Sequence, residues 1–201
     1  KRDWSSDVCS SDLDTEDPEI AAAARSLGVE VPFMRPRELA KLNMSPDETL
    51  GHMARVLHRD EHYDPDIIVM AYYQHPFVRA DHLEEAVDTL MIYGCDSVIG
   101  VRENTRYQWQ RGEQGLTPAT YPRGLLNDQK WAIYEERGGI YALNSNNLKT
   151  ESFLGKRISF IELDEVEGLR IDSEFTYWAA QEYWKKDQTE AKKQRRQSKT
   201  Q

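Results

Sequence analysis

Hydrophobic and polar positions between residues 64 and 101 follow a strand–helix–strand pattern. Residues 67–70, IIVM, form a continuous apolar run, which is typical of a strand buried on both faces of a parallel sheet. Apolar residues then recur at helical spacing until Gly94, and residues 97–101 begin a second strand. A crossover of this length predicts parallel strands, so the loop 71–79 lies where ligands bind in such sheets.

The pattern upstream of this unit predicts two helices and a short strand. Asp17 is a suitable N-cap before Pro18, and residues 29–33 have the composition of a strand. A loop with at most one helical turn follows. The run Ser45-Pro46-Asp47-Glu48 is then a capping box that opens the second helix.

The segment 102–129 is polar, with scattered aromatic residues, glycine and proline, and no periodicity. Structureless loops of this length usually work as a lid or as an arm that contacts a partner. The chain beyond it predicts, in order, strands at 131–134 and 139–143, a short helix at 144–154, a strand at 158–163 and a helix that opens at 171–174.

Composition narrows the class of protein. The chain has 201 residues, 30% of them charged, and a net charge of −9, which argues against broad nucleic-acid binding. No apolar run is long enough to span a bilayer, and no signal peptide is visible. The two cysteines give neither a disulfide framework nor metal-ligand spacing. These features predict a cytoplasmic protein without membrane or nucleic-acid partners.

Both ends of the chain differ from its centre. Residues 1–13, KRDWSSDVCSSDL, resemble translated sequencing-adaptor sequence and are expected to be a non-native or disordered leader. Residues 185–201 are basic and almost free of apolar side chains, so we expect a disordered tail, with a contact to a polyanion as the alternative. The folded domain is therefore expected over residues 14–184.

Four motifs carry a resemblance to a known family. VEVPFMRPRELA, HPFVRADHLEEA, RGGIYAL and LRIDSEFTYWAAQEYW have the order and spacing found in the acylneuraminate cytidylyltransferases, a family of CMP-sugar synthetases. The resemblance implies an α/β, Rossmann-like nucleotide-diphospho-sugar transferase fold with a mixed, mostly parallel sheet flanked by helices. It also implies a homodimer that uses Mg²⁺ to transfer CMP from CTP to a sugar acid, such as an acylneuraminate, with release of pyrophosphate.

The resemblance begins near Thr15, so the family's first strand and basic, glycine-containing phosphate loop have no counterpart in this sequence. Because phosphoryl transfer depends on cations that neutralise charge, we expect an N-terminally truncated chain that is inactive as this fragment. Glu135 stands where sialate-activating enzymes have an arginine. This departure, with Arg170, favours the alternative of a glycosyltransferase or another sugar nucleotidyltransferase on the same fold. A non-catalytic fragment is the other alternative, because the absent first strand would expose a sheet edge.

The resemblance assigns Arg35, Ser45, Pro46 and Tyr72 to nucleotide binding. A guanidinium such as that of Arg35 can bind or stack on a base edge, although Arg35 can equally be a surface residue. Ser45 can serve as an N-cap instead of a ligand contact.

The residues implied to bind the sugar substrate are Gln74, His75, Arg123, Arg137 and Tyr141. Arg123, in TYPRG, matches an arginine that binds the sugar carboxylate, for which a guanidinium is well suited. Arg137 and Tyr141 lie in RGGIY, which matches Asn-Gly-Ala-Ile-Tyr of the family. His75 can alternatively be a half-buried loop histidine with no role in binding.

The family's Asp-Ile-Asp motif holds Mg²⁺, and this chain has Arg170-Ile171-Asp172 in its place. The resemblance therefore makes Asp172 the catalytic metal ligand, with capping of the last helix as the alternative. Arg170 replaces one carboxylate by a cation that could neutralise phosphate. The resemblance also implies that segment 102–129 is a dimer arm that completes the neighbouring subunit's sugar site.

Overall fold

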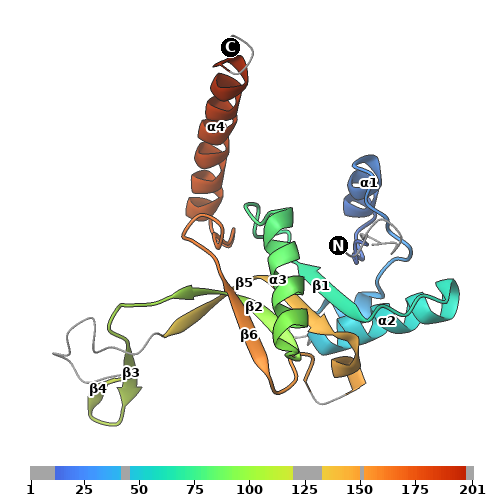
Figure 1. Ribbon diagram of the computed structural model, residues 1–201, viewed down its shortest axis with the longest axis horizontal. Helices are drawn as coiled ribbons and strands as arrows, with labels where there is room; N and C mark the ends of the chain where they lie inside the picture. The colour runs from blue at the N-terminus through green and yellow to red at the C-terminus, as the bar shows by residue number, and fades with distance from the viewer. Residues whose placement is uncertain (1–11, 42–45, 120–132, 150–151, 198–201) are drawn as a thin grey trace. The chain divides into compact units, whose positions relative to one another are not determined.

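The computed structural model describes residues 12–41, 46–119, 133–149 and 152–197 (Figure 1). The chain divides into two compact units, Lys1–Pro65 and Asp66–Gln201. Within the described ranges, none of the helices combines the length and the apolar character needed to cross a membrane.

The first unit contains the helices α1 (Pro18–Ser26) and α2 (Pro46–Glu61) and the 3₁₀ helix η1 (Arg37–Ala40). Asp17 caps α1 as predicted, because its Oδ1 accepts hydrogen bonds from the amides of Glu19 (2.7 Å) and Ile20 (3.3 Å). A small core forms where α1 packs against the segment that follows it. The buried residues of this core are Ala21, Ala24 and Val31, with Leu13 and Val29 packed against them.

The prediction of a strand at residues 29–33 is wrong, since the described residues form only an isolated bridge there, between Asp12 and Glu30. Pro32 has no amide hydrogen to contribute to a ladder, which limits pairing in this segment. The amide of Leu13 donates to the carbonyl of Glu30 (2.8 Å). Asp12 and Leu13 are therefore ordered, although the sequence placed them in the disordered leader.

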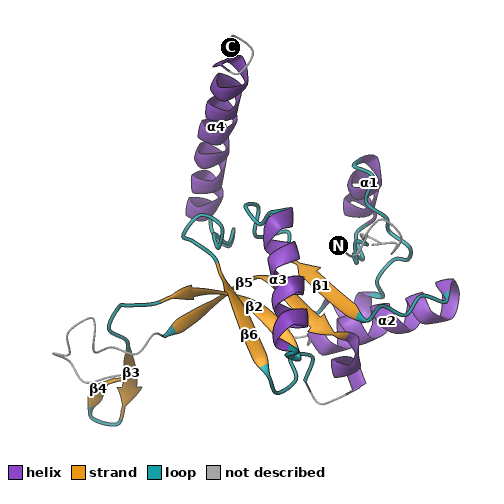
Figure 2. Cartoon of the chain, in the orientation of Figure 1, coloured by secondary structure: helices purple, strands orange, loops and turns teal. Residues whose placement is uncertain are grey.

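The second unit is built on a four-stranded sheet with the order β1-β5-β2-β6 (Figure 2). Its strands are β1 (Ile67–Ala71), β2 (Ser97–Glu103), β5 (Tyr134–Asn144) and β6 (Ile158–Glu162). The unit also contains α3 (Ala80–Tyr93), the 3₁₀ helix η3 (Ser145–Lys149), α4 (Glu174–Gln197) and a hairpin of β3 (Trp109–Gly112) and β4 (Gly115–Pro118).

The sheet is mixed, as predicted. Both β1 and β2 pair antiparallel with β5, and β6 pairs parallel with β2. The predicted β1–α3–β2 crossover is thus confirmed, because β1 and β2 run in the same direction. The two strands are not neighbours, however: β5, a strand from much later in the chain, lies between them.

The core of this unit lies between α3 and one face of the sheet (Figure 2). Apolar side chains of α3 meet those of the central strands, as the helical periodicity of residues 83–91 predicts. The buried residues are Ala86, Leu90, Cys95, Val98, Ile140, Ala142, Ile161 and Leu163. Cys95 is one of them, so this cysteine has a packing role.

Strand β5 contains the strand predicted at 139–143 and extends back to Tyr134, whereas residues 131 and 132 of the other predicted strand lie outside the described residues. Its pairing with β2 is interrupted, because Ile99 pairs with Tyr141 whereas Val101 pairs with Glu136. Extra residues of β5 therefore bulge opposite Gly100, where a Cβ would lie 2.8 Å from the carbonyl oxygen of Gly138. This close approach of two backbones requires glycine at position 100.

Three further predictions are modified by the structure. Part of segment 102–129 forms the β3–β4 hairpin rather than a structureless loop (Figure 1). The helix predicted at 144–154 is only the short 3₁₀ helix η3, Ser145–Lys149. The last helix begins where predicted and extends to Gln197, so residues 185–197 are helical instead of forming the expected disordered tail.

Candidate functional site

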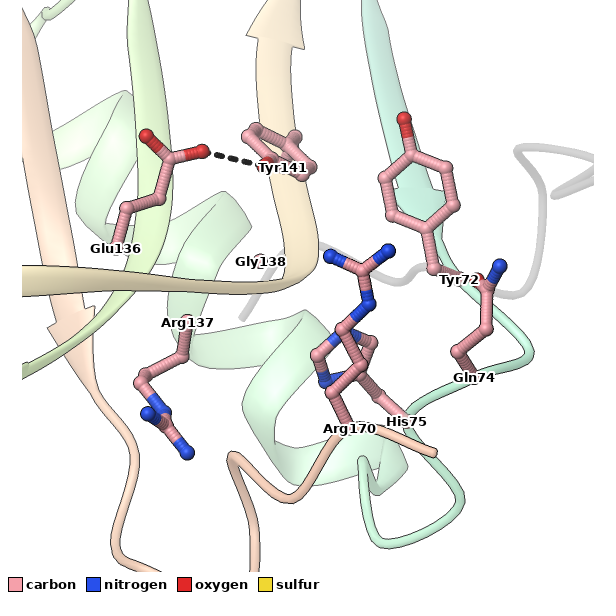
Figure 3. A pocket seen from close by; sticks show the side chains of 8 residues that line it. All are labelled: Tyr72, Gln74, His75, Glu136, Arg137, Gly138, Tyr141 and Arg170. Carbon is pink, nitrogen blue, oxygen red and sulfur yellow. Dashed lines mark hydrogen bonds between the residues drawn. The ribbon is translucent and has the colours of Figure 1, made fainter. Parts of the chain in front are cut away.

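A polar hollow of about 340 Å³ lies in the second unit, at the carboxyl end of β1 (Figure 3). Three chain segments form it: the loop after β1, the bulged part of β5 and the segment that leads into α4. The residues that line it are Tyr72, Gln74, His75, Glu136, Arg137, Gly138, Tyr141 and Arg170. The sequence placed five of these in the substrate or nucleotide site: Tyr72, Gln74, His75, Arg137 and Tyr141.

Backbone hydrogen bonds hold the loop after β1 against its neighbours. The amide of Tyr72 donates to the carbonyl of Gly139 (3.1 Å), and the amide of Ile171 donates to the carbonyl of Gln74 (2.8 Å). The loop is thereby tied to β5 on one side and to the segment before α4 on the other. This arrangement explains why residues far apart in the sequence meet in one hollow.

His75 is buried against the Gly138–Gly139 pair of β5, with only 6% of its surface exposed. A Cβ on Gly139 would lie 3.0 Å from His75 Cγ, so a larger residue would displace the imidazole. Both glycines also have positive φ, +68° and +81°, which side chains disfavour. His75 Nδ1 is buried and has no hydrogen-bond partner among the described residues.

The surroundings of His75 favour its neutral form. Burial is the main cause that lowers the pKa of the imidazole, and the positive charges of Arg170 and Arg137 lower it further. The carboxylate of Asp172 acts in the opposite direction without reversing the shift. Because an unshifted histidine titrates near 6.5, His75 is uncharged at neutral pH.

Two tyrosines and one carboxylate form the opposite wall. The rings of Tyr72 and Tyr141 meet edge to face, with centroids 5.8 Å apart. The hydroxyl of Tyr141 donates a hydrogen bond to Glu136 Oε1 (2.5 Å). Burial and the negative charge of Glu136 raise the pKa of both phenols, so both remain protonated donors at physiological pH.

The two arginines of the hollow differ in what they contact. The guanidinium of Arg137 donates to Glu135 Oε1 (3.0 Å) and to the carbonyl of Gly168 (3.2 Å). Arg170, in contrast, has no hydrogen bond or ion pair within the part of the chain that the structure describes. Figure 3 shows that the two guanidinium groups point apart.

Asp172 lies outside the lining of the hollow, immediately before α4, and is exposed. Its Oδ1 accepts a hydrogen bond from Thr176 Oγ1 (3.4 Å). Ser173 Oγ caps the helix by accepting from the amide of Thr176 (3.2 Å), so the capping role suggested for Asp172 belongs to Ser173. Across the described residues, no three acidic, histidine or cysteine side chains gather in a way that would hold a metal ion.

Arg35 lies in the first unit, and acidic side chains engage its guanidinium. Arg35 Nη2 and Nε donate to Glu16 Oε2 (2.7 and 3.2 Å), and Nη1 lies 3.6 Å from Asp14 Oδ2. Arg35 lowers the pKa of Glu16, whereas burial raises the pKa of Asp14 despite the nearby arginine. Pro46 opens α2, and the predicted site residues Ser45 and Arg123 fall outside the described residues.

Sequence reasoning did not place Glu136, Gly138 or Arg170 in the site. Gly138 already lies within the RGGIY motif, and extending that motif by one residue on its amino side would have included Glu136. Arg170 was noted as a departure from a metal-binding motif. Its position in the hollow depends on the long-range contact between Ile171 and Gln74, for which the local sequence carries no signal.

No protein-family model matches the chain. Among solved structures, CMP:2-keto-3-deoxy-manno-octonic acid synthetase in complex with CTP aligns with a TM-score of 0.59 at 17% identity, over 88% of this chain and 83% of that one. The 4-diphosphocytidyl-2C-methyl-D-erythritol synthase of Anaerococcus prevotii aligns with a TM-score of 0.51 at 10% identity, over 87% and 97%. The chain therefore has the Rossmann-like α/β fold of these nucleotidyltransferases.

Two relatives in sequence indicate which nucleotidyltransferases the chain resembles. N-acylneuraminate cytidylyltransferase A of Danio rerio is 25% identical over 194 residues, which cover 89% of this chain and 43% of that protein. N-acylneuraminate cytidylyltransferase of Oncorhynchus mykiss is 28% identical over 119 residues, 56% of this chain and 25% of that protein. The chain spans less than half the length of either relative, and its resemblance to the cytidylyltransferases is confirmed.

Proposed function

We propose that this chain belongs to a cytidylyltransferase that transfers CMP from CTP to a sugar acid and releases pyrophosphate, and that the chain by itself binds substrate without completing the transfer. The observation that carries the proposal is the polar hollow at the carboxyl end of β1, where the guanidinium of Arg170 has no partner among the described residues. Ligands of open α/β sheets bind at this edge. The sequence relatives, which are named as cytidylyltransferases, support the choice of nucleotide.

In the proposed reaction, a hydroxyl oxygen of the sugar acid bonds to the α-phosphorus of CTP. The bond between that phosphorus and the β-phosphate oxygen breaks, the hydroxyl proton passes to solvent, and pyrophosphate leaves. Negative charge develops on the phosphate oxygens, so a cation fixed beside them lowers the barrier. Arg170 is the residue of the hollow that is free to supply this charge.

We assign the substrate side of the site to Gln74, Arg137 and Tyr141, with neutral His75 beneath them. Tyr72 is a protonated donor that can hydrogen-bond a sugar or ribose hydroxyl, whereas Tyr141 donates its proton to Glu136 and can only accept through its oxygen. Arg137 contributes mainly by holding Glu135 and the carbonyl of Gly168. The roles of Arg35, Ser45 and Pro46 at the nucleotide and of Arg123 at the sugar remain predictions.

Magnesium is proposed as the cofactor, with Asp172 as its ligand from this chain. A single exposed carboxylate fits Mg²⁺ only where substrate phosphates and water complete the coordination, which is a usual arrangement for this ion. When bound, the ion would neutralise charge on the leaving pyrophosphate. An Asp172→Asn variant should therefore need a higher Mg²⁺ concentration to reach half-maximal nucleotide binding.

A homodimer is also proposed, with segment 102–129 as the contact arm. Its described part includes the β3–β4 hairpin, in which Leu116 is 70% exposed and Trp109 44% exposed. Exposed apolar side chains on this hairpin favour burial against a partner. Light scattering should give the dimer mass, and a monomer mass at high concentration would contradict this part of the proposal.

Another sugar nucleotidyltransferase on the same fold is the second candidate. Glu135 forms an ion pair with the guanidinium of Arg137. Because this pair leaves Arg137 less able to bind a sugar carboxylate, it favours a substrate other than a sialate. The nucleotide that the chain binds separates the two candidates. A cytidylyltransferase prefers CTP, whereas another sugar nucleotidyltransferase can prefer a nucleotide with a different base.

The proposal is tested by calorimetric titration of the chain with CTP, UTP, GTP and ATP in the presence of Mg²⁺. We expect CTP to bind more tightly than the other three. Preference for another nucleotide would favour the second candidate, and the absence of any nucleotide binding would contradict both. Pyrophosphate release in the presence of CTP and N-acetylneuraminate then tests the transfer itself, and we expect none from this chain alone.

A further inference from the structure

We infer that Arg170 is the residue that binds the substrate's oxyanion in this hollow, whether that oxyanion is a carboxylate or a phosphate. The inference deepens the proposed function and rests on it. A guanidinium presents a planar fork of donors that matches both groups in a bidentate manner.

The first argument is that Arg170 differs from the arginines around it. The two terminal nitrogens of Arg137 donate to Glu135 and to the carbonyl of Gly168, and its buried Nε has no partner among the described residues. Arg79, beyond the other end of the loop, lies 3.1 Å from Asp81 and 3.0 Å from Glu167. Arg170 has neither a hydrogen bond nor an ion pair among the described residues, so its five donors are available to a ligand.

The second argument is that the backbone holds Arg170 in place. A turn precedes it, in which the amide of Gly168 donates to the carbonyl of Asp164 (3.0 Å). Directly after it, the amide of Ile171 donates to the carbonyl of Gln74 (2.8 Å). The residue is therefore fixed between two anchored points, and a site on a fixed backbone binds with less loss of entropy than one on a loose segment.

The third argument comes from His75, which lines the same hollow as Arg170. Its side chain is more than nine-tenths buried, with 6% of the residue exposed, and its Nδ1 has no partner among the described residues. An unsatisfied buried polar atom in a polar hollow calls for a ligand or a water molecule. Its neutral state also leaves the nearby guanidinium as the dominant charge.

The fourth argument is the charge balance of the hollow. Glu136 is the one acidic residue in its lining, and the hydroxyl of Tyr141 donates to that carboxylate. Asp172, the other acid that acts on His75, lies outside the lining and is exposed. Because Arg137 is paired with Glu135, the remaining charges of the lining are Arg170 and a carboxylate that already accepts a hydrogen bond, so Arg170 is the cation available to an anionic ligand.

The test compares Arg170→Gln with Lys186→Gln, which removes the same charge from an exposed position of α4 away from the hollow. Each variant and the wild-type chain are titrated calorimetrically with CTP and Mg²⁺, with inorganic pyrophosphate, with N-acetylneuraminate and with its methyl ester. The ester lacks the carboxylate charge, so it reports whether that group is the one bound. Arg170→Lys, which keeps the charge but loses the fork, is the conservative variant.

We expect Arg170→Gln to weaken binding of one oxyanion probe by about tenfold or more, as for loss of a charge-assisted hydrogen bond. Lys186→Gln should bind like the wild-type chain, and Arg170→Lys should restore part of the affinity. A loss confined to N-acetylneuraminate, with weak binding of its ester by the wild type, identifies the carboxylate. A loss for pyrophosphate and CTP identifies the phosphate.

The inference is overturned if Arg170→Gln binds every probe as tightly as the wild-type chain. In that case a wild-type chain that still prefers CTP leaves the proposed function standing. If the wild-type chain binds none of the four probes, the inference and the proposed function both fail. The circular dichroism spectrum of Arg170→Gln should match that of the wild type, because no described side chain depends on this guanidinium.

Discussion

The surroundings of Arg35 and of Arg170 differ in one property that matters for binding. Arg35 lies in the first unit, where Glu16 and Asp14 occupy its guanidinium at 2.7 and 3.6 Å. Arg170 lies in the second unit, in a polar hollow, without such partners among the described residues. The sequence assigned Arg35 to nucleotide binding, and it marked Arg170, a cation that could neutralise phosphate, as a departure from a metal-binding motif.

The comparison shows that a motif match identifies a residue type but not its availability. A guanidinium already paired with a half-buried carboxylate must break that pair before it binds a ligand, and the lost pair costs part of the binding energy. An unpaired guanidinium has no such cost. Arg35 therefore contributes first to the stability of its unit, and Arg170 is free to act on a ligand.

The hollow can be disrupted without changing Arg170. Gly139→Ala places a methyl group 3.0 Å from His75 Cγ at a φ of +81°. We expect a loss of about 3 kcal/mol in the free energy of unfolding, from backbone strain and overpacking together. Gly94→Ala is the matched control, because its φ is +57° but no atom lies within 4 Å of the added Cβ.

Urea denaturation measures both variants. Gly94→Ala should lose only about 1 kcal/mol, the cost of the backbone conformation alone. Equal losses in the two variants would show that His75 does not pack against β5 as described.

The contrast between the two arginines is tested directly by Arg35→Gln and Arg170→Gln. Removing Arg35 leaves Asp14, whose side chain is 13% exposed, and Glu16 without their cation. We expect Arg35→Gln to lower the free energy of unfolding by about 2 kcal/mol, because a buried charge loses its partner. Arg170→Gln should change it by less than about 0.5 kcal/mol.

Urea titrations also measure the free energies of unfolding of Arg35→Gln and Arg170→Gln. If Arg170→Gln lowered the free energy of unfolding more than Arg35→Gln, Arg170 would have a structural partner. That result would contradict the difference described between the two arginines.

Tyr141 stabilises the negative charge of Glu136 in the hollow that also contains Arg170. Tyr141→Phe removes the hydrogen bond to Glu136 Oε1 and should cost about 1 kcal/mol. Tyr72→Phe, in the same hollow and without a hydrogen bond of its hydroxyl to a described residue, should cost less. Anion binding should also weaken in Tyr141→Phe, since Glu136 then lies in the hollow without its donor.

The smallest expected effect concerns pH. Burial and the two arginines lower the pKa of His75 in the folded chain below its ordinary 6.5, so between these two values the unfolded chain binds more protons. His75 therefore favours folding above pH 6.5, and this contribution is lost as the pH falls toward the folded-state pKa. His75→Gln should show a shallower loss of stability below pH 6.5 than the wild type, and parallel curves would contradict the assignment.

Local patterns in the sequence predicted much of the fold. Asp17 and Pro18 mark the start of α1, and the periodicity of α3 predicts its buried face. The insertion of β5 between β1 and β2 was not predictable, because strand order depends on pairings between distant segments. The bulge of β5 was missed for the same reason: Gly100 and Gly138 are informative only once the two strands are known to be neighbours.

The candidate site was predicted in part for related reasons. Tyr72, Gln74 and His75 follow a strand whose apolar run is clear in the sequence, so the loop could be located. The availability of a guanidinium cannot be predicted in this way. It depends on which carboxylates lie nearby, and Glu16 is 19 residues from Arg35 in the chain.

The most direct test of the account follows the arginine Nε–Hε resonances of the chain by NMR during a titration with inorganic pyrophosphate. The resonance that is absent from the spectrum of Arg170→Gln identifies Arg170. We predict that this resonance shifts first and most, while those of Arg137 and Arg35 move less because carboxylates already pair with their guanidinium groups. A titration in which Arg35 or Arg137 responds before Arg170, or in which none of the three responds, would contradict the account.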